Sequence, residues 1–179
     1  GEDAHEPLLT QRLSRPTEGR VEEYTLMGLP EGTKAVGIAL VSRGQTLIYK
    51  YCFVDIDTSV KETILPKTTV NLAVYDRIQE QVFDAHCIAC HGKSSGQPAG
   101  NLFLTEGKSY SALVNVKAGA PVANEKPYVT PGEPDNSFLM DILSENILGH
   151  NHTDIFNGSE TTEVNNLLNA WINNGAKEE

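Results

Sequence analysis

The chain has 179 residues, a formal net charge of −10 at pH 7, and 39% hydrophobic and 21% charged residues, so its composition excludes a long disordered polypeptide. The negative charge argues against DNA, RNA and anionic membranes as partners, because each of them repels an acidic surface. No apolar run approaches the ~18 residues that span a bilayer, and three cysteines are too few for a disulfide scaffold.

The first 20 residues predict an extended arm. They contain Arg12, Arg15 and Arg20 around Pro16, and they show little apolar periodicity. We expect residues 1–20 to be disordered or to lie on a partner or a neighbouring subunit.

Residues 21–70 predict a small antiparallel β region. Segments rich in β-branched and aromatic residues are expected to form strands, at 21–28, 35–42 and 46–55. Residues suited to turns separate them, at 29–33 and 42–45. A meander of this size is too small to be stable alone, so we expect it to pack on something else as a docking or assembly module.

The pattern becomes helical in residues 71–179, the second predicted domain. Asn71 is expected to cap a helix over 72–85, in which Val74, Ile78 and Val82 recur at fourfold spacing. The predicted fold class is therefore α+β, a mainly helical domain preceded by a small β region.

Two further helices are predicted in the same domain. One covers 137–143 and is capped by Asp135 or Asn136. The other begins near Thr161, and Gly175 is expected to end it. The last helix carries an apolar stripe at i, i+3, i+4 and i+7, formed by Val164, Leu167, Leu168 and Trp171.

A C-x-x-C-H motif follows the first predicted helix. Cys87 and Cys90 are placed so that each thiol can add to one vinyl group of a haem, and His91 can then bind the iron. Two alternatives are half of a zinc site, with His150 and His152 as distant partners, and a thioredoxin-type redox pair. Haem is favoured, because the zinc spacing is unlike a compact finger and a helix stands where thioredoxin needs a strand.

The C-terminal domain resembles class I cytochromes c of the monohaem type common in bacterial periplasmic and surface proteins. The resemblance covers about 60% of the chain, from residue 71 to residue 176, and the C-x-x-C-H segment is its most specific part. It is carried by the segments VFDAHCIACHG at 82–92, PGEPDNSFL at 131–139 and LLNAWINNGA at 167–176. The resemblance implies three or more helices around one covalently bound haem c.

The sequence departs from this family at the distal iron ligand, which is usually a methionine on the loop before the last helix. That loop contains His150 and His152 and no methionine. Imidazole is a good iron ligand, so we predict His/His coordination by His91 and His152. His150, Met140 within the second helix, and an open position are the alternatives. His86 is expected to be a helix-end side chain, and Glu160 a solvated carboxylate.

Electron transfer is the predicted function, without enzymatic activity, because a six-coordinate iron changes valence without binding substrate. The partners expected are redox proteins, and self-assembly through the N-terminal region is a further expectation. The alternatives are a haem enzyme, a gas or peroxide sensor, and a redox subunit of a larger enzyme or cytochrome assembly. The family resemblance implies haem attachment outside the cytoplasm, so we expect a mature, processed chain in the periplasm or at the cell surface.

Overall fold

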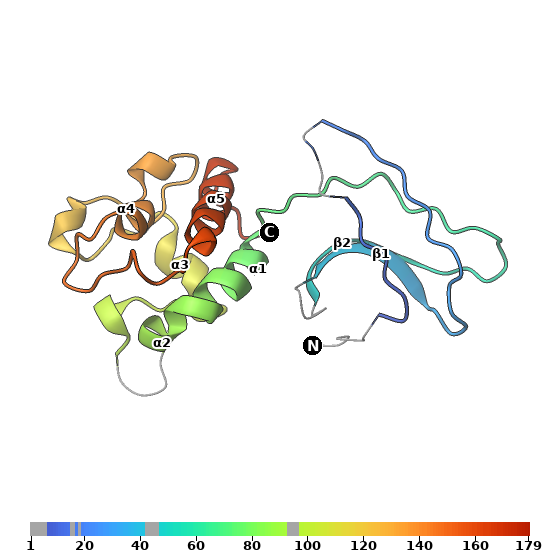
Figure 1. Ribbon diagram of the computed structural model, residues 1–179, viewed down its shortest axis with the longest axis horizontal. Coiled ribbons are helices and arrows are strands. Elements are labelled where there is room, and N and C mark those ends of the chain that lie inside the picture. Colours follow the sequence, from blue (N-terminus) through green and yellow to red (C-terminus); the bar gives the residue numbers. More distant parts are fainter. Residues whose placement is uncertain (1–6, 15–16, 18, 42–46, 93–96) are drawn as a thin grey trace. The chain divides into compact units, whose positions relative to one another are not determined.

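The computed structural model describes residues 7–14, 17, 19–41, 47–92 and 97–179. The chain divides into two compact units, Gly1–Asn71 and Leu72–Glu179. The described strands lie in the first unit and the described helices in the second (Figure 1). The α+β class expected from the sequence is confirmed.

The first unit contains an antiparallel pair of strands, β1 (Ala35–Val41) and β2 (Leu47–Asp55). Both match predicted segments, and the turn predicted at 42–45 lies outside the described residues. Gly37 lies opposite Phe53, and a Cβ on Gly37 would come within 2.6 Å of the Phe53 ring. The backbone oxygen of Cys52 would lie still closer to that Cβ, so glycine at this position lets both the neighbouring strand and the Phe53 ring come close.

The prediction of three or more strands is wrong for the residues that the structure describes. The segment 21–28 runs without a hydrogen-bonded partner strand, although its residues favour β structure. A strand exists only when its backbone groups pair with a neighbour, so β propensity alone does not form one. No described residue of the first unit is buried.

The second unit opens with a continuous helical run. It consists of α1 (Tyr75–Ile78), the π-helix η1 (Gln79–Cys87) and α2 (Ile88–His91). The predicted helix over 72–85 therefore begins later than expected, because Val74 rather than Asn71 is the last extended residue before it.

The helical run changes type after Ile78. A spacing of four departs about equally from the 3.6 residues of an α-helical turn and from the wider π turn, so it does not indicate which helix forms. Ile78 and Val82 are both fully buried. Periodicity predicts a helix here and does not distinguish its type.

The stretch between the first and last helices is irregular but well packed. It contains the helix α3 (Ser109–Leu113) and two short 3-10 turns, η2 (Ala99–Asn101) and η3 (Pro121–Ala123). Several of its apolar side chains belong to the core of the second unit, namely Leu102, Leu104, Leu113, Ala118, Ala123 and Val129.

The last two helices are α4 (Phe138–Ser144) and α5 (Ser159–Asn173). The predicted caps of α4, Asp135 and Asn136, instead lie in the 3-10 turn η4 (Pro134–Asn136), and Ser137 precedes the helix. Gly175 follows α5 with φ +91°, a conformation that favours glycine at a helix end. The predicted apolar stripe of α5 is confirmed, because Val164, Leu167, Leu168 and Trp171 are all buried.

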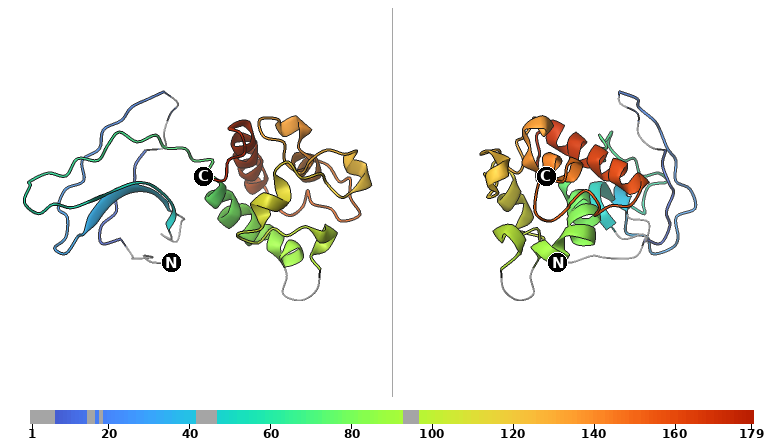
Figure 2. Two further views of the ribbon diagram at one scale, coloured as in Figure 1. Left: turned by 180° about the vertical axis from the view of Figure 1, so that it is seen from behind. Right: turned by 60° about the vertical axis from the view of Figure 1, so that its left-hand side comes forward.

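The core of the second unit forms where α5 packs against α1 and α4 (Figures 1 and 2). Tyr75 lies at its centre, with ring centroids 5.2 Å from Trp171, 5.2 Å from Tyr110 and 6.3 Å from Phe83. The Trp171 indole donates a hydrogen bond of 2.8 Å to the Lys177 carbonyl. Within the described ranges, no helix has the length and apolar character needed to cross a membrane.

Candidate functional site

The two cysteines of the motif lie on one helical turn. Cys87 is the last residue of η1, and Cys90 and His91 lie in α2. Residues three positions apart are neighbours on a helix surface, so the two thiols lie on the same side of the turn. Cys90 is exposed and Cys87 is half-buried against the core.

The surroundings of Cys87 do not suit a thiol–disulfide exchange pair. Burial, and secondarily the nearby Cys90, raise the pKa of the Cys87 thiol to about 12. Its Sγ lies 3.6 Å from the Val82 carbonyl, which accepts its proton in a hydrogen bond. Reactive C-x-x-C pairs lower the thiol pKa instead.

A zinc site is not completed within the described residues. No group of three or more His, Cys, Asp or Glu side chains that could hold a metal ion occurs there. The described residues do place two histidine rings close together, those of His91 and His152.

The rings of His91 and His152 lie close together, although the two residues are far apart in the sequence. Their ring centroids are 6.2 Å apart, and the ring planes are inclined at 34°. Two imidazoles that bind one metal atom from opposite sides, each through a bond of about 2.0–2.1 Å, have centroids roughly 6 Å apart. The centroid separation of His91 and His152 is close to this value.

The outer nitrogen of each ring lies beside a backbone carbonyl. Nδ1 of His91 is 3.3 Å from the Leu102 oxygen, and Nδ1 of His152 is 3.0 Å from the His150 oxygen. In the tautomer in which Nδ1 carries the proton, each nitrogen donates to its carbonyl and Nε2 keeps a free lone pair. This arrangement orients ligating histidines and makes them more basic toward a metal.

Partial burial lowers the pKa of His152. The positive charges that His150 and His91 would carry lower this pKa further, while the hydrogen bond to the His150 carbonyl opposes the shift. The net result favours neutral imidazole, the form that binds a metal.

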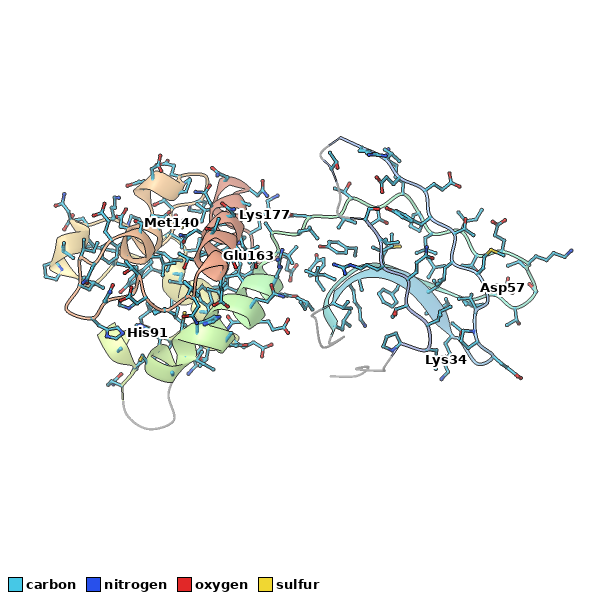
Figure 3. All side chains as sticks on the ribbon, viewed as in Figure 1. Lys34, Asp57, His91, Met140, Glu163 and Lys177 are labelled. Carbon is cyan, nitrogen blue, oxygen red and sulfur yellow. The ribbon has the colours of Figure 1, made fainter. Side chains whose placement is uncertain are left out.

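The structure separates the three candidates for the distal ligand. His152 is the residue whose ring lies close to that of His91, whereas His150 is exposed, with its ring 5.2 Å from His152. Met140 lies on α4, away from the end of α2 that carries His91, and it packs against the core (Figure 3). His150 contributes to the pair of His91 and His152 through its backbone carbonyl, which lies beside Nδ1 of His152.

Gln79 supports the loop behind His91 and was not identified from the sequence. Its buried amide nitrogen donates to the Leu104 carbonyl at 3.0 Å, and the Leu104 amide donates to the His91 carbonyl at 2.9 Å. The same amide also donates to Asp84 at 2.7 Å. Nothing in the sequence distinguishes Gln79 from Glu80 and Gln81, which are also polar and also lie between Ile78 and Val82. The role of the Leu102 carbonyl has no sequence signal either.

His86 joins the two sides of the site, although the sequence suggested separate, local roles for it and for Glu160. Its Nε2 lies 3.1 Å from a Glu160 carboxylate oxygen, and its ring packs edge-on at 4.9 Å against the buried Phe156. Phe156 follows His152 by four residues, and His86 directly precedes Cys87. The contact therefore ties the end of η1 to the segment that carries His152.

Comparisons of this chain with protein-family models, with curated proteins and with solved structures find no match. The functional interpretation accordingly depends on the motif residues and on the side chains that the fold brings to them. These are two thiols on one turn and two imidazoles whose spacing fits one metal atom.

Proposed function

We propose that the C-terminal unit is a monohaem c-type cytochrome domain whose function is electron transfer. Cys87 and Cys90 would hold one haem c covalently, and His91 and His152 would bind its iron. The observation that carries this proposal is the 6.2 Å separation of the two imidazole rings beside the C-x-x-C turn.

The side chains divide the work of holding this cofactor. The haem supplies a one-electron iron couple when it is bound. The thiols of Cys87 and Cys90 would attach it to η1 and α2, and the carbonyls of Leu102 and His150 hold the two histidine rings in orientation. With an imidazole on each side, no ligand position is left for a substrate, which favours electron transfer over catalysis.

The charge of this unit indicates the kind of redox partner. Residues 72–179 contain 6 basic and 14 acidic side chains, a net charge of −8. Such a surface speeds association with a positively charged partner and slows it with an acidic one. We propose a partner with a basic docking face, in the periplasm or at the cell surface, where this type of haem attachment takes place.

Mass spectrometry and an optical spectrum of the native protein test the proposal. The expected mass is that of the polypeptide plus one tetrapyrrole, and the expected spectrum is low-spin in both oxidation states. Cys87→Ala with Cys90→Ala should abolish covalent attachment. A bare polypeptide mass in the native protein would refute the proposal.

Three substitutions test the ligand assignment. His152→Ala should convert the iron to a high-spin form, whereas His150→Ala and Met140→Leu should leave the low-spin spectrum unchanged. Carbon monoxide provides a further test, because it should bind the His152→Ala variant and not the native protein. Ready binding to the native protein would instead support a gas sensor or haem enzyme.

A further inference from the structure

The segment that carries His152 contacts the η1–α2 run through both His86 and His91. The ring of His152 lies 6.2 Å from that of His91 in α2. Further along the same segment, Phe156 and Glu160 both contact His86, near the end of η1. The two contacts therefore join the same two stretches of chain. The contact at His86 limits where the ring of His152 can lie.

The ring of His86 packs against an apolar side chain of this segment. Its centroid lies 4.9 Å from that of Phe156, and the two ring planes are inclined at 72°. Phe156 is buried and belongs to the core of the second unit. Edge-to-face aromatic pairs at such separations stabilise a contact beyond the effect of the area that they bury. Because Phe156 is held in the core, its contact with His86 fastens η1 to a fixed point of the segment.

The carboxylate of Glu160 is oriented by the backbone at the beginning of α5. One of its oxygens lies 3.1 Å from Nε2 of His86, and the other accepts a hydrogen bond of 3.3 Å from the Asn157 amide. The Glu160 amide in turn donates to the Asn157 carbonyl at 3.0 Å. Most exposed ion pairs contribute little, partly because two long side chains lose freedom when they meet. Here the Asn157 amide already orients the carboxylate, so that loss is smaller.

We propose that His86 is a positioning residue for His152. Through Glu160 and Phe156 it holds the segment that carries His152 against the C-x-x-C turn, and so it would keep the imidazole of His152 on the iron of a bound haem. Without this contact the segment would leave the iron more often, and small external ligands would gain access to it. The inference rests on the proposed function, because it concerns the residue that completes the iron coordination.

The contact should affect the release of His152 more than it affects the stability of the whole unit. Local opening of one segment requires much less free energy than global unfolding. An interaction that holds only this segment therefore changes the rate of opening, while the core between α1, α4 and α5 stays packed. This difference separates a positioning role from a merely structural one.

The rate at which cyanide replaces His152 in the ferric native protein tests the proposal. At saturating cyanide this rate equals the rate at which His152 leaves the iron. His86→Ala should raise it about tenfold, because an aromatic contact and an ion pair are both lost. His86→Gln keeps a donor for Glu160 but has no ring, so its rate should lie between those of the native protein and His86→Ala.

Two variants of the same unit are matched controls. Lys126→Ala removes an ion pair of similar exposure, the 2.8 Å contact with Asp141, which lies elsewhere in the fold. Glu163→Gln changes an exposed carboxylate three residues after Glu160 on α5 (Figure 3). Neither should alter the cyanide rate, although Lys126→Ala should lower the urea midpoint of unfolding about as much as His86→Ala does.

A double-mutant cycle separates the ion pair from the other role of Glu160. Glu160→Ala alone also removes the hydrogen bond from the Asn157 amide, so its own effect does not isolate the contact with His86. The double variant His86→Ala, Glu160→Ala should raise the cyanide rate by less than the product of the two single effects, because its second change removes a partner that is already lost.

Equal cyanide rates in the native protein and His86→Ala would overturn the inference, and so would an equal rise in His86→Ala and Lys126→Ala. Single effects that simply multiply in the double variant would also overturn it, because His86 and Glu160 would then act independently. In each of these cases a covalently attached haem with a low-spin spectrum would leave the proposed function intact. A native protein without covalent haem would refute the proposed function itself.

Discussion

His152 is the residue that we propose as the second ligand of the haem iron, in place of the methionine that the sequence resemblance implies. Its ring lies close to that of His91, its Nδ1 lies 3.0 Å from the His150 carbonyl, and partial burial favours its neutral form by lowering its pKa. A methionine sulfur raises the potential of a haem relative to imidazole. The choice of residue at this position therefore sets the potential range of the proposed cytochrome.

The His152→Met variant should have a higher midpoint potential than the native protein, because the thioether stabilises ferrous iron. A potentiometric titration followed at the visible absorption bands measures the shift. His150→Met is the matched control and should leave the potential close to its native value. An equal shift in both variants would argue against His152 as the ligand.

Asp76 supplies a second prediction at the residue scale. Burial raises its pKa, and the nearby Glu106 and Glu179 raise it further. The folded state therefore binds the Asp76 proton more tightly than the unfolded state does. The stability that this proton contributes is fully present below the unfolded pKa of 3.8, and it is lost as the pH rises through the folded pKa. At pH 7 the carboxyl group of Asp76 is ionised, and its charge then lowers the stability of the folded state.

Asp76→Asn should accordingly raise the thermal stability at pH 7, by no more than about 0.5 kcal/mol for a surface position. The gain should shrink as the pH falls toward 3.8 and disappear below it. Thermal unfolding followed by circular dichroism between pH 3 and pH 7 measures this difference. A gain that stays the same from pH 7 to pH 3 would contradict the prediction.

At the scale of elements, the π-helix η1 connects the core to the site. Ile78 and Val82 anchor the helical run in the core, and Cys87 ends η1 at the beginning of the C-x-x-C turn. Gln79 joins this helix to the loop that carries the Leu102 and Leu104 carbonyls. The helix and the loop are thus held together by a buried polar network as well as by apolar packing.

Gln79→Leu should destabilise the protein by about 1–3 kcal/mol, because the Leu104 carbonyl and the Ser109 hydroxyl would lose a buried partner. Chemical denaturation monitored by circular dichroism measures the loss. Gln81→Leu, two positions along the same helix at a partly exposed side chain, should cost much less. Equal losses in the two variants would show that the buried network does not contribute.

The whole molecule combines two units of different character. Leu72–Glu179 has an extensive apolar core, whereas no described residue of Gly1–Asn71 is buried. Under the proposed function, the stability of the second unit should depend on haem attachment.

The Cys87→Ala, Cys90→Ala double variant should have a melting temperature at least roughly 10 °C lower than the native protein. A covalently held cofactor that binds the folded state stabilises it, and about 2–3 kcal/mol corresponds to a shift of this size in a unit of about 100 residues. Differential scanning calorimetry measures it. The matched control is Cys52→Ala in β2, which should retain the cofactor and unfold near the native temperature.

Local sequence was sufficient for much of the fold. The α+β class, both described strands and the buried stripe of α5 follow from residue types and their spacing, because β propensity and helical periodicity are properties of neighbouring residues. Local sequence predicted a strand over segment 21–28 that does not form, because a strand requires a pairing partner and no local pattern specifies one. It also missed the π-helix, since apolar spacing does not reveal how many residues complete a turn.

The sequence by itself determined the C-x-x-C-H motif and limited the candidates for the proposed second iron ligand to a few residues, because these depend on residue identity and order along the chain. Only the tertiary structure decided that His152 rather than His150 or Met140 lies close to His91, and that carbonyls of Leu102 and His150 orient the two rings. Such contacts join segments about 60 residues apart or use backbone atoms common to all residues. Their geometry is therefore settled by how the core packs and not by any local pattern.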